Sequence, residues 1–318
     1  MGPRRTFVLA VASICALAII AFTSDTPPVQ SEQAVPPEVW HKAAKLSVNI
    51  GGIPVMNYEN RLRQVGELVA YKDTDDPRRL EEAKHVKSVW IIVLKKEATD
   101  EKIKDICADS KHHHMTCKGE GHPSTGGVAL IEVESSETDL EPLMLKHQGE
   151  VSFIEPDGEV KALPVATAAD PRSLHHLNAS YVVWGLDRVD QRTGRDGVYR
   201  STLTGEGVHV YVVDTGVRVT HTDFSGRAVP AIESLGSGVV ECSNTSTTCA
   251  NDTDGHGTHC AGTVGGTTFG VAKHARLHSA KVLGADGGKW SWILLAEDWI
   301  ARKGMRPAIA SMSLGGRG

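Results

Sequence analysis

The chain has 318 residues, of which 40% are hydrophobic, and a formal net charge of −5 at pH 7. This composition suits packed cores and excludes a disordered or fibrous protein, and the length gives room for about two domains. A pI near 6.3 and scattered Lys and Arg residues exclude the basic field that nucleic acid requires, so no nucleic-acid partner is expected.

The first residues, 1–24, have the pattern of a secretory signal peptide. Arg4 and Arg5 precede an apolar run from Phe7 to Phe22, which ends in polar and proline-rich sequence. A membrane anchor is the alternative, because the run approaches the length that spans a bilayer. We expect cleavage of the signal, and hence a protein that is secreted or lies in the secretory lumen, without a membrane partner afterwards.

Residues 25–86 form an N-terminal extension to which the sequence assigns no function, apart from a short predicted helix over 36–46. The segment 87–161 alternates apolar runs with helical spacing, which predicts a small α+β domain whose sheet carries two helices on one face. Thr99 and Ser136 are the predicted helix starts. The predicted elements are a strand over 88–96, a helix over 99–112, a strand over 127–133, a helix over 136–147 and a strand over 151–157.

Residues 162–178 are small and polar, as expected of an exposed linker at which a precursor is processed. From 179 to 318 strands alternate with helices, which predicts an α/β domain with a parallel sheet. Its first strand, over 207–214, is apolar and β-branched, as strands buried on both faces are. The elements predicted after it are a helix over 256–266, a strand over 275–283, a helix over 291–305 and a strand over 308–314.

The six cysteines suggest pairing within segments, because Cys15 would leave with the signal. The predicted pairs are Cys107 with Cys117, and Cys242 with Cys249, which bracket a polar loop. This pairing leaves Cys260 as a free thiol. Glycosylation sequons begin at Asn178, Asn244 and Asn251.

The stretch "DGHGTHCAG", residues 254–262, and the strand end "VVDTGV" carry the candidate chemistry. Asp214 ends its strand, and in open α/β sheets functional groups gather beyond the carboxyl ends of strands. An Asp that accepts a hydrogen bond from His Nδ1 fixes the tautomer, so Nε2 can take a proton from a hydroxyl nucleophile. Gly255 and Gly257 let other backbone approach closely. We therefore predict Asp214 and His256 as the catalytic carboxylate and base.

Two other interpretations of these motifs are an aspartic protease and a metal site. "DTG" also occurs in aspartic proteases, but those enzymes need a second Asp in a β-rich chain, and this segment alternates strands with helices. His256 and His259 could bind a metal, but the Glu of "HExxH" and a third ligand with suitable spacing are absent, so no metal is predicted. His259 is interpreted as structural.

Taken together, the motifs resemble those of the subtilisin-like serine proteases, in the same order and approximate spacing. The motifs are "YVVDTGV", "DGHGTHCAGTVGG", "FGVAK", "AKVLGADG" and "MSLGG". "WGLDRVDQR" resembles the start of mature proteinase K-like members, and 87–157, closing with "FIEPD", resembles their inhibitor propeptide. The resemblance implies a secreted precursor that hydrolyses peptide bonds through an acyl-enzyme. Its expected partners are protein or peptide substrates and its own propeptide, an intramolecular inhibitor.

The resemblance also implies roles for individual residues. Asp214 and His256 match two members of the catalytic triad, and Cys260 matches a thiol beneath the catalytic His. An extended peptide substrate would bind by main-chain hydrogen bonds between two edges. One edge matches Ser313, Leu314 and Gly315, and the opposite wall matches Gly287, Gly288 and Trp290.

Three departures from the family pattern limit what the resemblance implies. His209 stands where proteinase K-like fungal enzymes carry a disulfide cysteine, and the partner cysteine is also absent. The stretch 264–273 lacks the insertion that forms a high-affinity calcium loop, so no calcium is expected there, and no cofactor is certain. Calcium elsewhere in a complete protein stays open. The family nucleophile, a Ser in a "GTSMA"-type motif, and the Asn of the oxyanion hole do not occur in the sequence.

Ser313 does not replace that nucleophile, because its matched place is in the substrate-binding strand. We therefore expect 179–318 to be the N-terminal half of a subtilisin-like peptidase domain, incomplete and inactive by itself. The alternative is a non-catalytic protein, a propeptide-type inhibitor or pseudoprotease that binds other subtilases.

Overall fold

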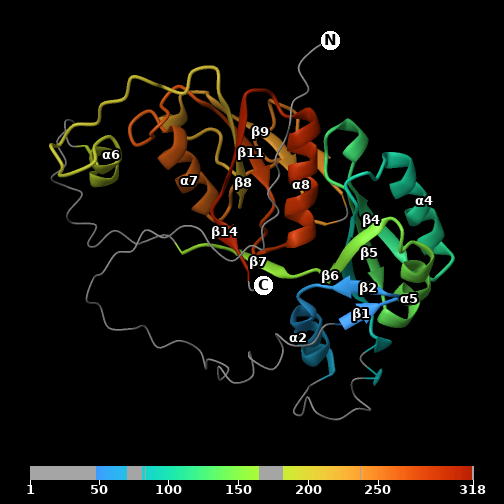
Figure 1. Cartoon of the computed structure of the whole chain (residues 1–318). Helices are drawn as coiled ribbons and strands as arrows, with labels where there is room; N and C mark the ends of the chain where they lie inside the picture. The colour runs from blue at the N-terminus through green and yellow to red at the C-terminus, as the bar shows by residue number, and fades with distance from the viewer. Residues whose placement is uncertain (1–47, 70–80, 83, 165–181, 237, 317–318) are drawn as a thin grey trace. The chain divides into compact units, whose positions relative to one another are not determined.

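The computed structural model describes residues 48–69, 81–82, 84–164, 182–236 and 238–316 (Figure 1). The predicted signal, the predicted helix over 36–46, the sequon at Asn178 and most of the predicted linker lie outside these residues. Within them the strands form three sheets. The short helices of the described chain are η1 (Pro123–Thr125), α6 (Trp184–Val189) and η3 (Thr222–Phe224).

The first sheet has six strands in the order β1-β2-β6-β3-β5-β4. From β6 to β4, each strand is antiparallel to the next. β-Branched side chains pack well on a pleated surface, which explains the central strand with the sequence "SVWIIVL". The strands are β1 (Val48–Ile50), β2 (Ile53–Val55), β3 (Ser88–Leu94), β4 (Thr116–Glu120), β5 (Leu130–Ser135) and β6 (Val151–Pro156).

Helices α4 (Asp100–Lys111) and α5 (Glu137–Lys146) pack on this sheet. Both predicted starts are confirmed, because the Thr99 and Ser136 side chains accept hydrogen bonds from backbone amides three residues later, at 3.3 and 3.1 Å. The helices bury one face each against alternate residues of β3 and β5, as their apolar spacing predicts. This core contains Trp90, Ile92, Ile103, Ile106, Ile131, Val133, Leu140, Leu143 and Met144.

The sequence analysis missed several elements of this sheet. Strand β4 was not predicted, and a disulfide between Cys107 and Cys117, with Cα atoms 5.6 Å apart, joins it to α4. That cysteine pair was predicted. Residues 48–69, to which no structure was assigned, form β1, β2 and helix α2 (Tyr58–Val69). The six-stranded sheet therefore begins well before residue 87.

The second sheet has five strands in the order β10-β9-β11-β8-β13. Strands β9, β11, β8 and β13 run parallel to their neighbours, which confirms the predicted parallel sheet, and β10 is antiparallel at one edge. The strands are β8 (His209–Asp214), β9 (Ala228–Glu233), β10 (Val240–Glu241), β11 (Arg276–Lys281) and β13 (Ala308–Met312).

Strand β8 is covered on both faces, which is why its interior residues are apolar. Val210 and Val212 share a core with α7 (His256–Gly265). Tyr211 and Val213 share another core with α8 (Trp290–Lys303). Because β8 is parallel to its neighbours, its last residue, Asp214, lies at the carboxyl edge of the sheet, where it is fully buried.

The third sheet joins the chain that follows the six-stranded sheet to two short strands from the C-terminal part of the chain, residues 205–316. Strand β7 (Glu159–Ala162) lies between β12 (Gly288–Lys289) and β14 (Leu314–Gly315), antiparallel to both. Val160 is fully buried in the core that contains Tyr211 and Ile293. The chain that follows the six-stranded sheet is thus inserted between two short strands of the C-terminal part.

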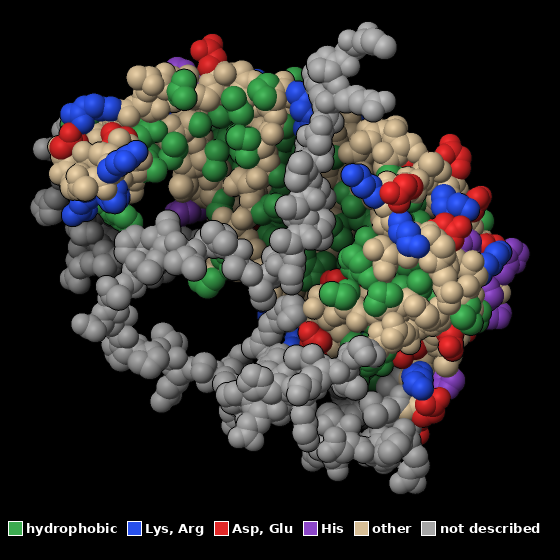
Figure 2. All heavy atoms as spheres, viewed as in Figure 1, with side chains coloured by type: hydrophobic (Ala, Val, Ile, Leu, Met, Phe, Trp, Pro, Cys, Tyr) green, Lys and Arg blue, Asp and Glu red, His purple; other side chains and the backbone are tan. Residues whose placement is uncertain are grey.

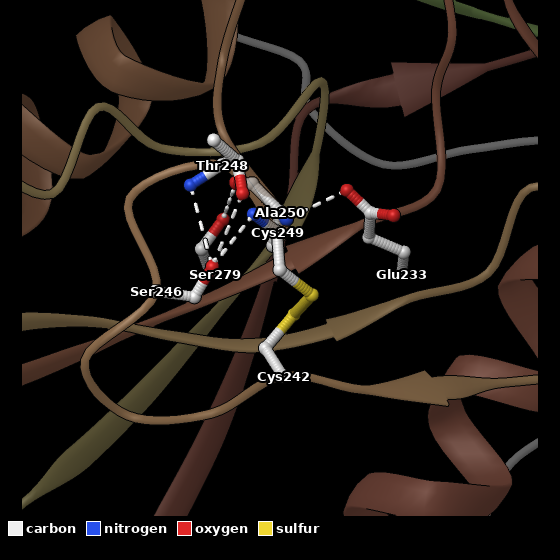
Figure 3. The surroundings of a disulfide bond; sticks show 7 residues. All are labelled: Glu233, Cys242, Ser246, Thr248, Cys249, Ala250 and Ser279. Carbon is white, nitrogen blue, oxygen red and sulfur yellow. Dashed lines mark hydrogen bonds between the residues drawn. A yellow bond between two sulfur atoms is a disulfide. The ribbon is translucent and has the colours of Figure 1, made fainter.

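A second disulfide closes the polar loop after β10 (Figure 3). Cys242 and Cys249 are joined as predicted, with Cα atoms 5.6 Å apart. Ser246 Oγ accepts a hydrogen bond from Cys249 N (3.0 Å), and Glu233 accepts one from Ala250 N (2.7 Å). These contacts attach the loop to β9 at the carboxyl edge of the sheet.

The described part of the face in Figure 2 shows no concentration of one charge. On the face in Figure 2, Lys and Arg side chains are interspersed with Asp and Glu side chains. None of the helices in the described part of the chain has the length and apolar character needed to cross a membrane.

His209, which stands in place of a family cysteine, pairs with another histidine. His209 Nδ1 lies 2.8 Å from His278 Nε2 on the neighbouring strand, and Tyr211 stacks on the His278 ring at 4.5 Å. Burial, followed by the charges of His209 and Arg276, lowers the pKa of His278 to about 4. His278 is therefore neutral in the folded protein across the physiological range.

The histidine pair predicts a loss of stability in acid. Unfolded His278 takes up a proton near pH 6.5, whereas the folded protein resists protonation until about pH 4. The contribution of His278 to stability is full above pH 6.5, and this contribution to the free energy of unfolding should fall by about 3 kcal/mol between pH 6.5 and 4. Denaturant titrations of wild type and His278→Phe across this range measure the effect. The variant should lose this acid sensitivity, and His274→Gln, at an exposed position, is the control. An equal change of the free energy of unfolding with pH in wild type and His278→Phe would contradict the assignment.

Candidate active site

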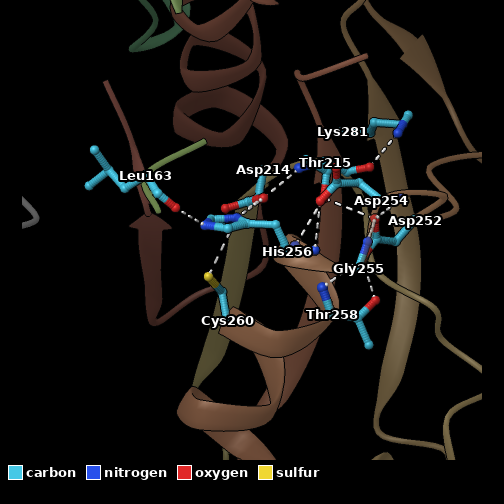
Figure 4. A network of polar contacts seen from close by, with 11 residues as sticks. Leu163, Asp214, Thr215, Asp252, Asp254, Gly255, His256, Thr258, Cys260 and Lys281 are labelled. Atoms are coloured by element: carbon cyan, nitrogen blue, oxygen red, sulfur yellow. Dashed lines mark hydrogen bonds and ion pairs between the residues drawn. The ribbon is translucent and has the colours of Figure 1, made fainter. Parts of the chain in front are cut away.

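Asp214 and His256 lie side by side where β8 ends and α7 begins (Figure 4). His256 Nδ1 is 2.7 Å from Asp214 Oδ1, and both side chains are buried. A carboxylate can only accept, so Nδ1 carries the hydrogen of this bond. The contact holds the imidazole with Nε2 directed away from Asp214, the orientation that a general base requires.

His256 Nε2 faces the residue that follows β7. The Leu163 carbonyl oxygen is 2.8 Å from Nε2. A carbonyl also only accepts, so both ring nitrogens donate at once only when the imidazole is protonated. Among the described residues no hydroxyl is hydrogen-bonded to Nε2. Leu163 was not predicted as a site residue, because no local pattern indicates that the linker returns to His256.

Asp252 organises the turn that places His256, and the sequence analysis missed it. Its Oδ1 accepts hydrogen bonds from Thr215 Oγ1 (2.9 Å) and Gly255 N (2.9 Å). Its Oδ2 accepts from Thr258 N (2.8 Å) and Thr258 Oγ1 (2.6 Å). Burial alone would raise the pKa of Asp252, but these hydrogen bonds outweigh it and lower the pKa below its usual value. One ionised carboxylate thus ties the end of β8 to the first turn of α7.

Two glycines let this turn form. Gly255 has a φ of +109°, which side chains rarely adopt, and it directly precedes the helix. A Cβ at Gly257 would lie 2.1 Å from Gly216 O, and Gly257 N donates to Thr215 Oγ1 (2.9 Å). The close approach predicted from these glycines therefore occurs between β8 and α7.

Two further side chains lie beside the pair. Cys260 is the free thiol of the described chain, with Sγ 3.8 Å from His256 Nδ1, and burial raises its pKa. Buried Lys281 donates to the Thr215 carbonyl oxygen. The ligand atoms of Asp214, His256 and Cys260 all lie within 4.8 Å of one another, a spacing at which they could hold a metal ion.

The residues matched to the substrate-binding edges surround β7. Leu163 N donates to Ser313 O (2.9 Å), and β14 pairs Leu314 with Ala162 and Gly315 with Lys161. On the opposite side Gly288 pairs with Val160, a Cβ at Gly287 would lie 2.6 Å from Val160 O, and Trp290 N donates to Gly158 O (3.1 Å). The six predicted residues are therefore gathered along one extended strand, which belongs to the same chain.

Two buried carboxyl groups of the first sheet lie next to the start of α8. Asp157 accepts hydrogen bonds from Ser291 N (3.1 Å) and Ser291 Oγ (2.7 Å). Burial, followed by the charge of Asp157, raises the pKa of Glu132 to about 7. Since the unfolded value is 4.5, the contribution of Glu132 to stability is full below pH 4.5 and is lost as the pH rises through 7.

Other predicted residues lie apart from this site. His259 is exposed. Asn244 is exposed and Asn251 is half-buried, both in or beside the disulfide-closed loop. Their glycosylation stays a prediction.

Comparisons with known proteins match part of the chain to serine proteinases. Residues 205–318 match the sequence profile of Peptidase_S8, the subtilase family. The extracellular serine proteinase of Thermus sp. (strain Rt41A) is 41% identical over 191 residues, covering 59% of this chain and 41% of that protein. Subtilisin-like protease 5 of Arthroderma benhamiae (strain ATCC MYA-4681 / CBS 112371) is 32% identical over 246 residues, covering 74% of this chain and 57% of that protein.

Among solved structures, a cold-adapted subtilisin-like serine proteinase is 38% identical, with a TM-score of 0.38. The match covers 44% of this chain and 49% of that one. The chain spans between 41% and 57% of the length of the two curated relatives.

Proposed function

We propose that His256, oriented by Asp214, performs the acid–base steps of a serine endopeptidase, because residues 205–318 match the profile of the subtilase family. The observation that carries the proposal is the buried 2.7 Å contact between Asp214 Oδ1 and His256 Nδ1, with Nε2 facing an extended peptide strand. A hydrolase of this kind needs a carboxylate that accepts from Nδ1 of the histidine, which leaves Nε2 to serve as the base.

The chemistry follows from the tautomer that Asp214 fixes. His256 Nε2 takes the proton of a hydroxyl nucleophile as its oxygen attacks the scissile carbonyl carbon, and then returns the proton to the leaving amine. Water repeats the cycle on the acyl-enzyme and releases the second product. Since no described hydroxyl lies on Nε2, we expect the 318-residue chain by itself to hydrolyse no peptide bond.

We also propose that the six-stranded sheet and β7 inhibit the site within the same chain. Support comes from β7, which fills the gap between β12 and β14 and places the Leu163 carbonyl on His256. Main-chain pairing on both sides is the way in which an extended peptide is bound at sheet edges. The same strand would compete with any substrate.

A chimera tests the peptidase proposal. In the Thermus relative, the segment that matches residues 205–315 is replaced by this chain's residues, so that the relative supplies the remainder of its own domain. We expect the chimera to hydrolyse a peptide amide and to be stopped by a serine-directed inhibitor. A folded chimera without activity would contradict the proposal.

The second candidate function is inhibition of other subtilases without catalysis. It is favoured by the complete six-stranded sheet, whose core closes without residues 205–318. The purified 318-residue chain, added to the Thermus relative, would then inhibit it. Absence of inhibition at micromolar concentration would contradict this candidate function. The proposal that β7 inhibits the site of its own chain would be unaffected.

Secretion is part of the proposal. Its support is the signal pattern over 1–24 together with a relative whose name describes an extracellular proteinase. A secreted product that begins after residue 24 is the expected result of expression with the native N-terminus.

A further inference from the structure

We propose that residues 48–69, which precede the predicted inhibitor domain, fix the register of β7 between β12 and β14. The inference rests on the proposed role of β7 as the inhibitory strand. Its basis is a set of contacts by which α2 reaches Asp157 and Gly158, the two residues that connect β6 to β7.

The hairpin of β1 and β2 attaches this segment to the sheet beside β6. Val55 of β2 pairs with Ile154 of β6 in parallel, and Met56 N donates to Ile154 O (2.8 Å). Ile50, Ile53 and Val55 are buried in the same core as Trp90. The segment is therefore part of the sheet beside β6, the strand that leads to Asp157 and Gly158. These two residues are called the connector below.

Helix α2 is held on the sheet by a buried charge. Arg61 is 1% exposed, and its Nε lies 3.2 Å from Glu137 Oε1. Its Nη2 donates to Val86 O (2.5 Å), and its guanidinium lies over the Trp90 ring, 5.6 Å from the centroid. Tyr58 OH also donates to Glu137 (2.9 Å). Breaking a buried pair leaves an uncompensated charge, so α2 has one strongly preferred position.

From this position α2 contacts the connector directly. Gln64 Nε2 donates to the Asp157 carbonyl oxygen. A Cβ at Gly158 would lie 3.1 Å from Asn60 Nδ2 and 3.0 Å from Trp290 Cδ1. The connector therefore lies between α2 on one side and the first residue of α8 on the other.

The α8 side completes the arrangement. The Asp157 carboxylate accepts two hydrogen bonds from Ser291, and Gly158 O accepts one from Trp290 N (3.1 Å). With Asp157 and Gly158 fixed, strand β7 lies between β12 and β14 in one register. Val160 is then buried, and the Leu163 carbonyl lies at His256. A one-residue slip would turn Val160 away from its core and move the Leu163 carbonyl off Nε2.

Hydrogen exchange of the 318-residue chain tests the inference. In Gln64→Ala, we expect the amide of Leu163, which donates to Ser313 O, to exchange roughly tenfold faster than in wild type, because a hydrogen bond that fixes the connector is lost. Amides between β3 and β5 should keep their protection. Glu59→Gln, on the same helix but without a hydrogen bond to the connector, is the matched control.

Three outcomes separate this inference from the proposal on which it rests. Faster exchange at Leu163 in Gln64→Ala alone supports the inference. Equal slow exchange in wild type and Gln64→Ala overturns it and leaves the inhibitory role of β7 intact. Rapid exchange at Leu163 in the wild-type chain overturns both.

Discussion

Replacement of His256 by alanine in the chimera is expected to lower kcat/KM by about 10⁴-fold or more. The substitution removes the group that takes the proton from the nucleophile, and the loss of one triad member removes most of the catalytic gain. KM should change little, because the edges that bind an extended peptide, β12 and β14, do not include His256. The measurement is steady-state hydrolysis of a peptide amide near pH 8.

The neighbouring histidine is the control for this prediction. His259→Ala lies three residues further along the same helix and is exposed, so its kcat should stay within a few-fold of the parent chimera. Equal losses for both variants would indicate disruption of α7 and not removal of a base. Serine-inhibitor-sensitive turnover that persists in His256→Ala would contradict the catalytic assignment.

The second large effect is expected at Trp90 in the six-stranded sheet. Trp90 is 0% exposed, and its Nε1 donates to Ser135 O (3.1 Å) beneath the Arg61 guanidinium. Trp90→Ala leaves a cavity, an unpaired carbonyl and a buried cation without its ring. Together these should lower the free energy of unfolding by about 3–5 kcal/mol. Denaturant titration followed by far-ultraviolet circular dichroism measures the change.

Trp90→Phe serves as the matched variant. It keeps most of the ring volume and loses the hydrogen bond, so a loss of about 1–2 kcal/mol is expected. If Trp90→Ala costs no more than Trp90→Phe, the packing of the ring is not what stabilises this sheet.

Strand β8 could be predicted from sequence because its interior residues are apolar on both faces. Strand β11 is mostly polar and was predicted from its place in the alternation of strands and helices. Strand β9 was missed because Pro230 interrupts a short run. Strand β7 was missed for another reason. Its partners, β12 and β14, lie far away in sequence, and no local pattern in "EVKA" indicates pairing.

Some residues of the candidate site could also be predicted from sequence, and others could not. Asp214 and His256 were found because each stands in a motif that the chemistry explains. Asp252 was missed because it acts mainly on backbone amides of its own turn, and its signal is only an acidic residue three positions before a glycine of positive φ. Leu163 carries no signal at all, since a leucine beside a proline is ordinary linker sequence.

The long-range pairing of β7 has a consequence for the folding rate. Its partner residues, Gly288 and Leu314, follow it by more than a hundred residues, whereas every pairing in the six-stranded sheet joins residues fewer than a hundred apart. Contacts of high sequence separation form slowly, because the intervening chain must be ordered first. The six-stranded sheet is therefore expected to fold early, and β12 and β14 are expected to pair with β7 late. Assembly of the site and occlusion of His256 would then coincide in the last kinetic phase of folding, so no conformer with an assembled and open site would accumulate along the way.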